Sequence, residues 1–226
     1  SWRPETIQQT LRNIDAVRDL YDPKHMCFTD EDFFCDLTRI RQLLPEFKKR
    51  GFTWDANCRA YHFRGGFLND TMLAEMHDAG CRGLRFGLES GSQRILNMLK
   101  KGLTPRQSIL AIQQALRHGI MPNASFMFGL PGETLDDALK TMNLVLTIKR
   151  INPAIDILGP QMFRPYPGSS LFDECVQKGL RVPQMLENWS TFYMYDDAPF
   201  TKEYLQWISN NDDFRKLSLW RQYLNN

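Results

Sequence analysis

Cysteine is scarce in this chain and widely scattered. The five cysteines are Cys27, Cys35, Cys58, Cys81 and Cys175. An odd number of separated cysteines argues against a disulfide framework and favours a reducing compartment, so we expect a cytoplasmic protein. No two of them lie two or three positions apart, and the four histidines lack zinc-ligand spacing. The sequence therefore predicts no metal site built from its own residues.

The chain also lacks the marks of several other protein classes. No apolar run approaches the ~18 residues that cross a bilayer, and no signal-peptide pattern opens the sequence. A net charge of +2 gives no reason to expect a nucleic-acid or membrane partner. The Gly87–Gly91 turn carries Glu89 where a nucleophilic serine would stand. Because Ser1 opens the chain without an initiator methionine, we interpret the sequence as a piece of a longer protein.

What the chain does contain is an alternation of strand-like and helical segments. Repeated βα units predict an α/β fold around a parallel sheet, and 226 residues fit one domain of the barrel type. The expected strands lie near residues 25–30, 52–59, 83–89, 123–129 and 155–163. The expected helices cover residues 4–21, a segment containing Pro45, 69–79, a segment from Ser92, 104–119 and 134–149. Pro45 predicts a kink or a split in its helix, and Thr104 with Gln107 predicts a capping box.

Several of the expected strands alternate apolar and polar residues. The polar sets are Asp55, Asn57 and Arg59 in the second strand, Arg85, Gly87 and Glu89 in the third, and Asn123, Ser125 and Met127 in the fourth. Because helices cover the apolar face of a sheet, these sets are expected to point the other way, into a barrel lumen. A barrel packed for stability alone would fill its lumen with Val, Ile and Leu. We therefore interpret the polar lumen as a ligand pocket.

The segment Gly87–Ser92, followed by Ile95-Leu96 and Lys100-Lys101-Gly102, resembles the corresponding segment of radical S-adenosylmethionine (SAM) enzymes. The branch that it resembles often carries a cobalamin-binding domain before the radical domain. Further matches in the expected order are Phe28–Phe34, Trp54–Arg59, Ala79–Cys81, Phe126–Thr134, and Arg164–Ser169 followed by Leu171. Together, the matches extend over about residues 3–189.

The resemblance implies a partial TIM-type (β/α)6 barrel of parallel strands with outer helices, whose first strand is missing. Members of the family hold a 4Fe–4S cluster through a CxxxCxxC loop after that strand, and this chain contains no such loop. We therefore expect the first strand and the cluster ligands upstream of residue 1. Residues 1–189 would form the partial barrel, and residues 190–226 a helical or irregular extension packed on it.

The resemblance also implies that the full-length protein is an enzyme. It would cleave SAM reductively to a 5′-deoxyadenosyl radical, which abstracts hydrogen from a small-molecule substrate, while this chain alone would be inactive. Methyl transfer or rearrangement would use cobalamin bound by a missing N-terminal domain. A cluster-free, non-catalytic relative that binds a ligand or partner is the main alternative, and a cofactor-independent hydrolase using Glu89 and Asp30 is a third. The open edge beside Met26–Asp30 predicts pairing with the missing upstream segment or with a second copy.

Glu89 and Ser90 end the third strand, where the resemblance implies contacts with the ribose or the amino-acid end of SAM. A carboxylate can accept hydrogen bonds from ribose hydroxyls or from an ammonium group. Alternatively, Glu89 caps the following helix. Arg59 could hold the cofactor carboxylate through a bidentate pair, or it could form a salt bridge with Asp30, Asp55 or Glu89.

Five further positions complete the predicted cofactor site. The resemblance places Met127 against the adenine ring and gives Gly129 a close backbone approach to the ligand. Ser125 stands where family members often have glycine, and Met127 could equally fill the core. Asp30 could line the barrel mouth, and Arg164 could reach the lumen or anchor its loop. No catalytic residue is assigned.

Overall fold

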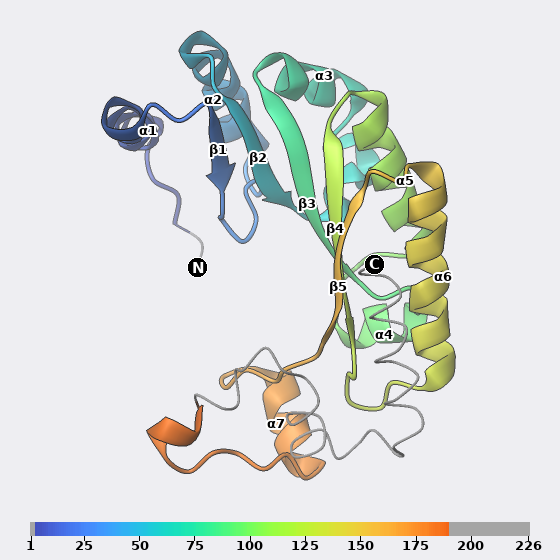
Figure 1. Ribbon diagram of the computed structural model, residues 1–226. Coiled ribbons are helices and arrows are strands. Elements are labelled where there is room, and N and C mark those ends of the chain that lie inside the picture. The colour runs from blue at the N-terminus through green and yellow to red at the C-terminus, as the bar shows by residue number, and fades with distance from the viewer. Residues whose placement is uncertain (1–2, 190–226) are drawn as a thin grey trace. The chain divides into compact units, whose positions relative to one another are not determined.

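The computed structural model describes residues 3–189, in which helices and strands alternate along the chain (Figure 1). Every strand and helix expected from the sequence is present, with bounds that differ by a few residues, whereas the patterns do not predict η1, α7 or η2. The elements are α1 (Ile7–Tyr21), β1 (His25–Phe28), α2 (Leu37–Arg50), β2 (Thr53–Cys58), η1 (Ala60–Gly66), α3 (Asp70–Asp78), β3 (Cys81–Glu89), α4 (Gln93–Met98), α5 (Pro105–Arg117), β4 (Met121–Phe128), α6 (Leu135–Ile151), β5 (Asp156–Met162), α7 (Ser170–Gln177) and η2 (Leu186–Asn188).

The five strands form one parallel sheet in the order β1-β2-β3-β4-β5. β1 pairs with β2 in a parallel register that runs from His25 opposite Thr53 to Phe28 opposite Ala56, and β2 pairs in parallel with β3. Consecutive strands are thus neighbours, and a helix follows each of them. This is the strand order of a partial barrel of βα units, as the sequence predicts.

β1 is the terminal strand of the sheet, and within residues 3–189 no strand pairs with its second edge. The Thr53 N–H donates to the Lys24 carbonyl at 3.0 Å. Because successive residues of a strand direct their backbone groups to opposite sides, Cys27 directs its N–H and carbonyl to the unpaired edge. Within the described residues, the edge of β1 is therefore unpaired, as the sequence predicts, and Cys27 lies on it.

Contacts divide the chain into two compact units. Of the described residues, the first contains 3–88, Gly102–Ala124 and Ile148–Asp156, and the second contains Glu89–Lys101, Ser125–Thr147 and 157–189. Residues 190–226 lie outside the described part of the chain. The predicted boundary at residue 190 therefore stays a prediction.

The apolar face of each alternating strand is buried, as its sequence predicts. In the first unit, Trp54 of β2 is fully buried against a group of phenylalanine rings, with centroid distances of 5.9 Å to Phe28, 5.6 Å to Phe33 and 5.7 Å to Phe47. Figure 1 shows α3 and α5 on one side of this unit's strands. The second unit has two apolar clusters, one of Phe128, Ala138 and Met142 and one of Met162, Cys175 and Leu180.

Helix α2 contains Pro45 but is not divided by it, so the expected split does not occur. Proline inside a helix costs ~3 kcal/mol because it removes one backbone hydrogen bond and crowds the preceding turn. The buried residues of α2 lie on both sides of the proline: Ile40, Leu43, Leu44 and Phe47. Burial of each such side chain stabilises by roughly 1.5–3 kcal/mol, which is enough to keep one continuous helix.

The start of α5 follows the predicted capping box. The Gln107 N–H donates to Thr104 Oγ1 at 3.2 Å, and the Thr104 N–H donates to Gln107 Oε1 at 2.9 Å. Pro105 occupies the first turn, where its missing N–H costs nothing. These local contacts fix where α5 begins.

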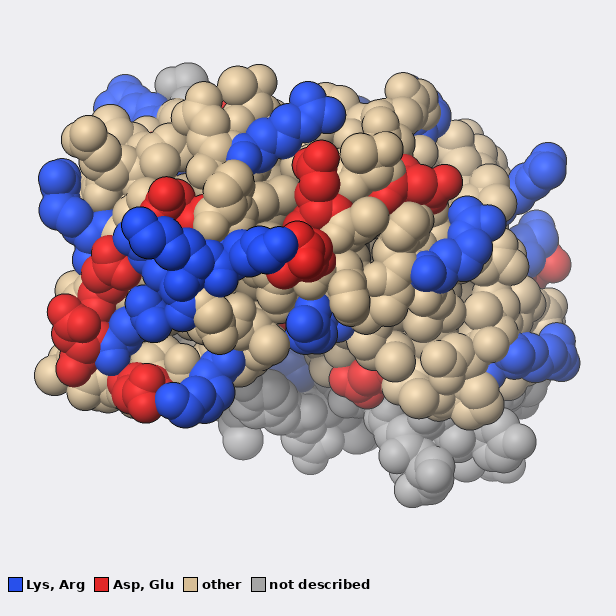
Figure 2. All heavy atoms as spheres, turned by 90° about the horizontal axis from the view of Figure 1, so that it is seen from above, with Lys and Arg blue, Asp and Glu red and all other residues tan. Residues whose placement is uncertain are grey.

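Basic and acidic side chains lie beside one another on the face seen in Figure 2. Arg50 pairs with Asp15 at 2.7 Å, and Lys48 pairs with Asp78 at 2.5 Å. This interspersion matches the small net charge of +2. None of the described helices has both the length and the apolar character needed to cross a membrane.

Candidate functional site

The carboxyl end of β3 carries a strained residue, Glu89. Its φ is 63°, in the left-handed region that residues other than glycine rarely adopt. Such strain costs about 1–3 kcal/mol and is concentrated at ligand sites. The Glu89 side chain is 13% exposed and accepts a hydrogen bond from Lys101 Nζ at 2.7 Å. The N-cap of the following helix is Ser92, so Glu89 precedes the helix rather than occupying its cap position.

The turn after Glu89 is packed directly onto α6. Gly91 has no room for a side chain, because a Cβ there would lie 2.2 Å from the Lys140 carbonyl oxygen. The Gly91 N–H donates to Thr141 Oγ1 at 3.0 Å, and the Ser90 hydroxyl bonds to the same oxygen at 2.9 Å. Ser90 is fully buried by these contacts. Its expected contact with a cofactor stays a prediction.

A buried carboxylate, Asp137 on α6, joins this turn to the loop that follows β4. Ser92 Oγ donates to it at 2.5 Å, Thr134 donates through N–H at 3.0 Å and through Oγ1 at 2.6 Å, and Arg94 forms an ion pair with it. Burial raises the pKa of Asp137, but the hydrogen bonds from Arg94, Ser92 and Thr134 outweigh burial and hold that pKa well below its usual range. Sequence reasoning missed Asp137, although Thr134-x-x-Asp137 is a capping-box pattern.

The loop after β4 is closed by a second buried carboxylate, Glu133. Its Oε2 accepts hydrogen bonds from the Gly129 N–H at 2.6 Å and from the Leu130 N–H at 3.1 Å. Its Oε1 is buried and has no hydrogen-bond partner within residues 3–189. Burial raises the pKa of Glu133 to about 7, although both amide donors favour the charged form. The backbone of Gly129, which was predicted to approach a ligand, is thus bonded within its own loop.

The polar face of the first unit is tied together by Arg85. Its guanidinium donates to Asn57 Oδ1 at 2.9 Å, to Asp55 Oδ1 at 3.0 Å and to the Phe28 carbonyl at 2.7 Å. One side chain on β3 therefore bonds to β1 and β2 across the polar face. The predicted polar sets are present, and in this unit many of their side chains form hydrogen bonds with one another.

Arg59 lies just after β2 and forms an ion pair through Nε with Asp32 Oδ2 at 3.4 Å. The sequence suggested Asp30, Asp55 or Glu89 as salt-bridge partners of Arg59. The observed partner is none of these three carboxylates. Asp32 also lies 2.8 Å from Nε2 of the buried His62. The histidines lack zinc-ligand spacing, and a contact between positions 32 and 62 is too distant in the sequence to leave a local signal.

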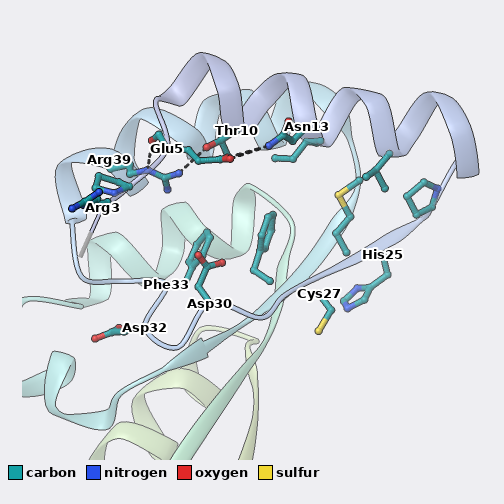
Figure 3. Close-up of a pocket in the computed structure, with 16 residues that line it drawn as sticks. Arg3, Glu5, Thr10, Asn13, His25, Cys27, Asp30, Asp32, Phe33 and Arg39 are labelled. Carbon is teal, nitrogen blue, oxygen red and sulfur yellow. Dashed lines mark hydrogen bonds between the residues drawn. The ribbon is translucent and has the colours of Figure 1, made fainter. Parts of the chain in front are cut away.

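A cavity of about 550 Å³ lies between α1 and β1 in the first unit (Figure 3). Its volume falls within the usual range of small-molecule pockets. Arg39 donates to Thr10 Oγ1 at 2.7 Å on the α1 side, while Asp30 and Asp32 line the cavity beyond the end of β1. Asp30 is exposed, and its carbonyl accepts a hydrogen bond from Asn57 Nδ2 at 2.8 Å. That Asp30 lines the mouth of the barrel stays a prediction.

The remaining predicted residues lie in the second unit. Ser125 and Met127 are half-buried on β4, opposite its fully buried face, and Arg164 is half-buried after β5. The structure therefore places Glu89, Ser90, Ser125, Met127, Gly129 and Arg164 in the second unit, and Asp30 and Arg59 in the first. Their roles as cofactor contacts stay predictions.

The cysteines do not fit an iron–sulfur cluster. Within residues 3–189, no group of three or more His, Cys, Asp or Glu side chains could hold a metal ion. Cys58, Cys81 and Cys175 are buried, and burial raises the pKa of each thiol, to about 11 for Cys175, which disfavours the thiolate that a metal requires.

A family model described as the radical SAM superfamily matches residues 2–145, more than half of the chain. An uncharacterised methyltransferase of Pyrococcus horikoshii is 27% identical over 205 residues, which cover 90% of this chain and 42% of that protein. The anaerobic magnesium-protoporphyrin IX monomethyl ester cyclase of Rubrivivax gelatinosus is 26% identical over 215 residues, which cover 93% of this chain and 37% of that protein. The chain spans less than half the length of these relatives.

Two solved structures show the same fold. The cobalamin-dependent S-adenosylmethionine radical enzyme OxsB matches with a TM-score of 0.57 and 25% identity, covering 64% of this chain and 23% of that one. The radical S-adenosylmethionine methyltransferase TsrM of Kitasatospora setae, with cobalamin and a 4Fe–4S cluster, matches with a TM-score of 0.64 and 16% identity. That match covers 80% of this chain and 36% of TsrM.

The buried Glu133 predicts a specific pH dependence of stability. Because its pKa is raised from 4.5 to about 7, the folded chain binds this proton more tightly than the unfolded chain. The contribution is complete below pH 4.5 and is lost as pH rises through 7. We expect the free energy of unfolding to fall by about 3 kcal/mol across this window, and Glu133→Gln to remove that dependence.

Urea unfolding between pH 4 and 8 measures the effect. The exposed Glu75 on α3 supplies a control, since Glu75→Gln should leave the pH profile as in the wild type. Equal pH profiles for Glu133→Gln and the wild type would show that Glu133 titrates normally.

Proposed function

This chain belongs to the radical SAM superfamily, and from that premise we propose that it supplies the SAM-binding part of a radical SAM enzyme. The proposal rests on the conformation and the position of Glu89. It is a left-handed, largely buried carboxylate at the carboxyl end of a parallel strand, where ligand groups collect in barrels of βα units. It also stands at the centre of the segment whose sequence resembles the family.

The side chains at these strand ends fit the chemistry of SAM. The Glu89 carboxylate can accept hydrogen bonds from ribose hydroxyls or from the ammonium group, and its pairing with Lys101 keeps it compensated until a ligand arrives. The half-buried Met127 offers an apolar surface for the adenine ring. Arg59 offers guanidinium donors for the carboxylate. When bound, SAM supplies the radical-forming chemistry; the residues of this chain hold and orient it.

We propose that the 4Fe–4S cluster is held by ligands outside this chain, because the described cysteines do not fit it. Cobalamin-dependent methyl transfer is the reaction class that the relatives favour, since one is named a methyltransferase and OxsB is described as cobalamin-dependent. A small-molecule substrate would approach the polar face of the strands. A cluster-free, non-catalytic relative is the second candidate, and the lack of a metal-binding group within residues 3–189 is compatible with both candidates.

The unpaired edge of β1 supports a further part of the proposal, that a strand from the upstream segment completes the sheet. The cavity beside β1 is lined on its walls by Ile14, Val17, Met26 and Phe28, apolar side chains that an added strand would cover. An edge of this kind is a template for one more strand.

Binding of SAM to this chain tests the first proposal. Equilibrium dialysis should detect binding by the wild-type chain, and Glu89→Gln should weaken it about tenfold, since it removes a charged acceptor while preserving side-chain size. Glu174→Gln, at the exposed Glu174–Lys178 pair of α7, is the matched control and should bind as the wild type does. Undiminished binding by Glu89→Gln, or no binding by the wild type, would contradict the proposal.

Substitution at Cys27 tests the open edge. Cys27→Pro removes the N–H that faces this edge and leaves the bonds between β1 and β2 in place. We expect the chain to bind the separately expressed upstream segment of its full-length protein, and Cys27→Pro to weaken that binding at least about tenfold, while Cys27→Val retains it. Equal binding by all three chains would show that the edge is not used. Dimerisation of the chain alone, abolished by Cys27→Pro, would assign the edge to a second copy.

A further inference from the structure

The first unit contains a buried histidine that no part of the proposed function uses. His62, in η1, is 2% exposed and lies among aromatic rings. Its ring stacks on Phe67 with a centroid distance of 5.1 Å and an interplanar angle of 17°, and it lies 4.2 Å from the Tyr61 ring. Phe34 contributes an edge contact at 6.5 Å. By shape alone, this environment would accept phenylalanine.

What the imidazole adds is a hydrogen bond to Asp32. Nε2 lies 2.8 Å and 3.1 Å from the two carboxylate oxygens, and because a carboxylate only accepts, Nε2 carries the hydrogen. Nδ1 is buried with no hydrogen-bond partner within residues 3–189. Burying a nitrogen without a hydrogen-bond partner costs free energy. The hydrogen bond to Asp32 is the polar contact of the His62 ring that offsets this cost. Any function of His62 therefore acts through its hydrogen bond to Asp32.

Asp32 is contacted from several sides, Tyr61 included. Besides His62, its Oδ1 accepts a hydrogen bond from the Phe34 N–H at 3.3 Å, and its Oδ2 faces Arg59 Nε at 3.4 Å. Burial raises the pKa of Asp32, but His62, Arg59 and the Phe34 amide outweigh burial and keep that pKa below its usual value. The carboxylate is thus charged and fixed in orientation at the wall of the cavity (Figure 3).

Arg59 is the outward end of this chain of contacts. Its side chain is 57% exposed, and Asp32 is its single ion-pair partner within residues 3–189. The contact uses Nε, which leaves the Nη1–Nη2 edge of the guanidinium available to bind a carboxylate in a bidentate manner. An exposed arginine otherwise samples many rotamers, and ordering them on binding reduces affinity.

We propose that His62 and Asp32 are positioning residues that preset Arg59 to bind the carboxylate at the amino-acid end of SAM. The inference rests on the proposed function and adds to it a selection for ligands that carry this carboxylate. His62 orients Asp32 by its hydrogen bond, the Asp32 carboxylate attracts Arg59 through the ion pair at Nε, and the free edge of Arg59 receives the anion. No proton or electron moves in this arrangement; its effect is orientation.

A comparison of two ligands distinguishes a positioning role of His62 and Asp32 from a purely structural role. S-adenosylhomocysteine and its decarboxylated analogue share the adenosine and the amine and differ in the carboxylate. The measured quantity is the ratio of their dissociation constants, obtained by calorimetry with the full chain. Wild type should prefer the carboxylate at least about tenfold, as a charge-assisted bidentate pair implies, and Arg59→Gln should abolish the preference.

Variants of His62 then test the positioning. His62→Phe keeps the aromatic packing but removes the donor, and we expect the preference to fall about fivefold or more. His62→Gln places an amide donor near the Nε2 position and should retain most of the preference, and Asp32→Asn should lose it. Phe52→Leu disturbs the aromatic core of the first unit, where Phe52 packs on Phe47, without touching His62 or Asp32, so it should lower the melting temperature and leave the ratio unchanged.

Each remaining result decides against the proposal in a distinguishable way. An unchanged ratio in His62→Phe, with the ratio lowered in Arg59→Gln, overturns the positioning role and leaves SAM binding intact. Equal affinity of the wild type for both ligands would show that Arg59 does not bind the carboxylate. This result overturns the inference but not the proposed function. Absence of binding by the wild type overturns the proposed function and this inference together.

Discussion

The second unit depends on one buried charge, the carboxylate of Asp137. It receives hydrogen bonds from Ser92 in the turn after β3 and from Thr134 in the loop after β4, and it pairs with Arg94. Removing one partner of a buried charge costs about 3–5 kcal/mol, because the charge is then left uncompensated. Both strand-to-helix turns are therefore fixed by the same group. Gly91 in the first of these turns lies so close to α6 that a Cβ would be 2.2 Å from the Lys140 carbonyl oxygen, so only glycine fits there.

The polar face of the sheet divides into groups that bind one another and groups that keep capacity for a ligand. Arg85, Asp55 and Asn57 bond to one another, and Ser90 is buried against Thr141. Glu89 and Arg59 differ, because each has one ionic partner and retains further acceptor or donor positions. This contrast makes them the strongest candidates for ligand contacts among the residues predicted from the sequence.

The local features of this fold are predictable from the sequence, and the partnerships between distant residues are not. Alternation of period two in β2, β3 and β4 predicts which face is buried, and Thr104 with Gln107 predicts the start of α5, because these signals act over a few residues. The partner of Arg59 is Asp32, although three other carboxylates were considered. The roles of Asp137 and His62 depend on contacts across 45 and 30 positions. Pro45 does not split its helix, because burial on both sides of it, a tertiary effect, stabilises one continuous helix.

The family assignment, the partial barrel and the left-handed Glu89 support one central proposal, that this chain binds SAM for radical chemistry in a larger protein. The most direct test uses the full-length protein that contains the chain, with its 4Fe–4S cluster reconstituted under anaerobic conditions and reduced in the presence of SAM. The account predicts 5′-deoxyadenosine as a product. An intact, reducible cluster that yields no 5′-deoxyadenosine from SAM would contradict it.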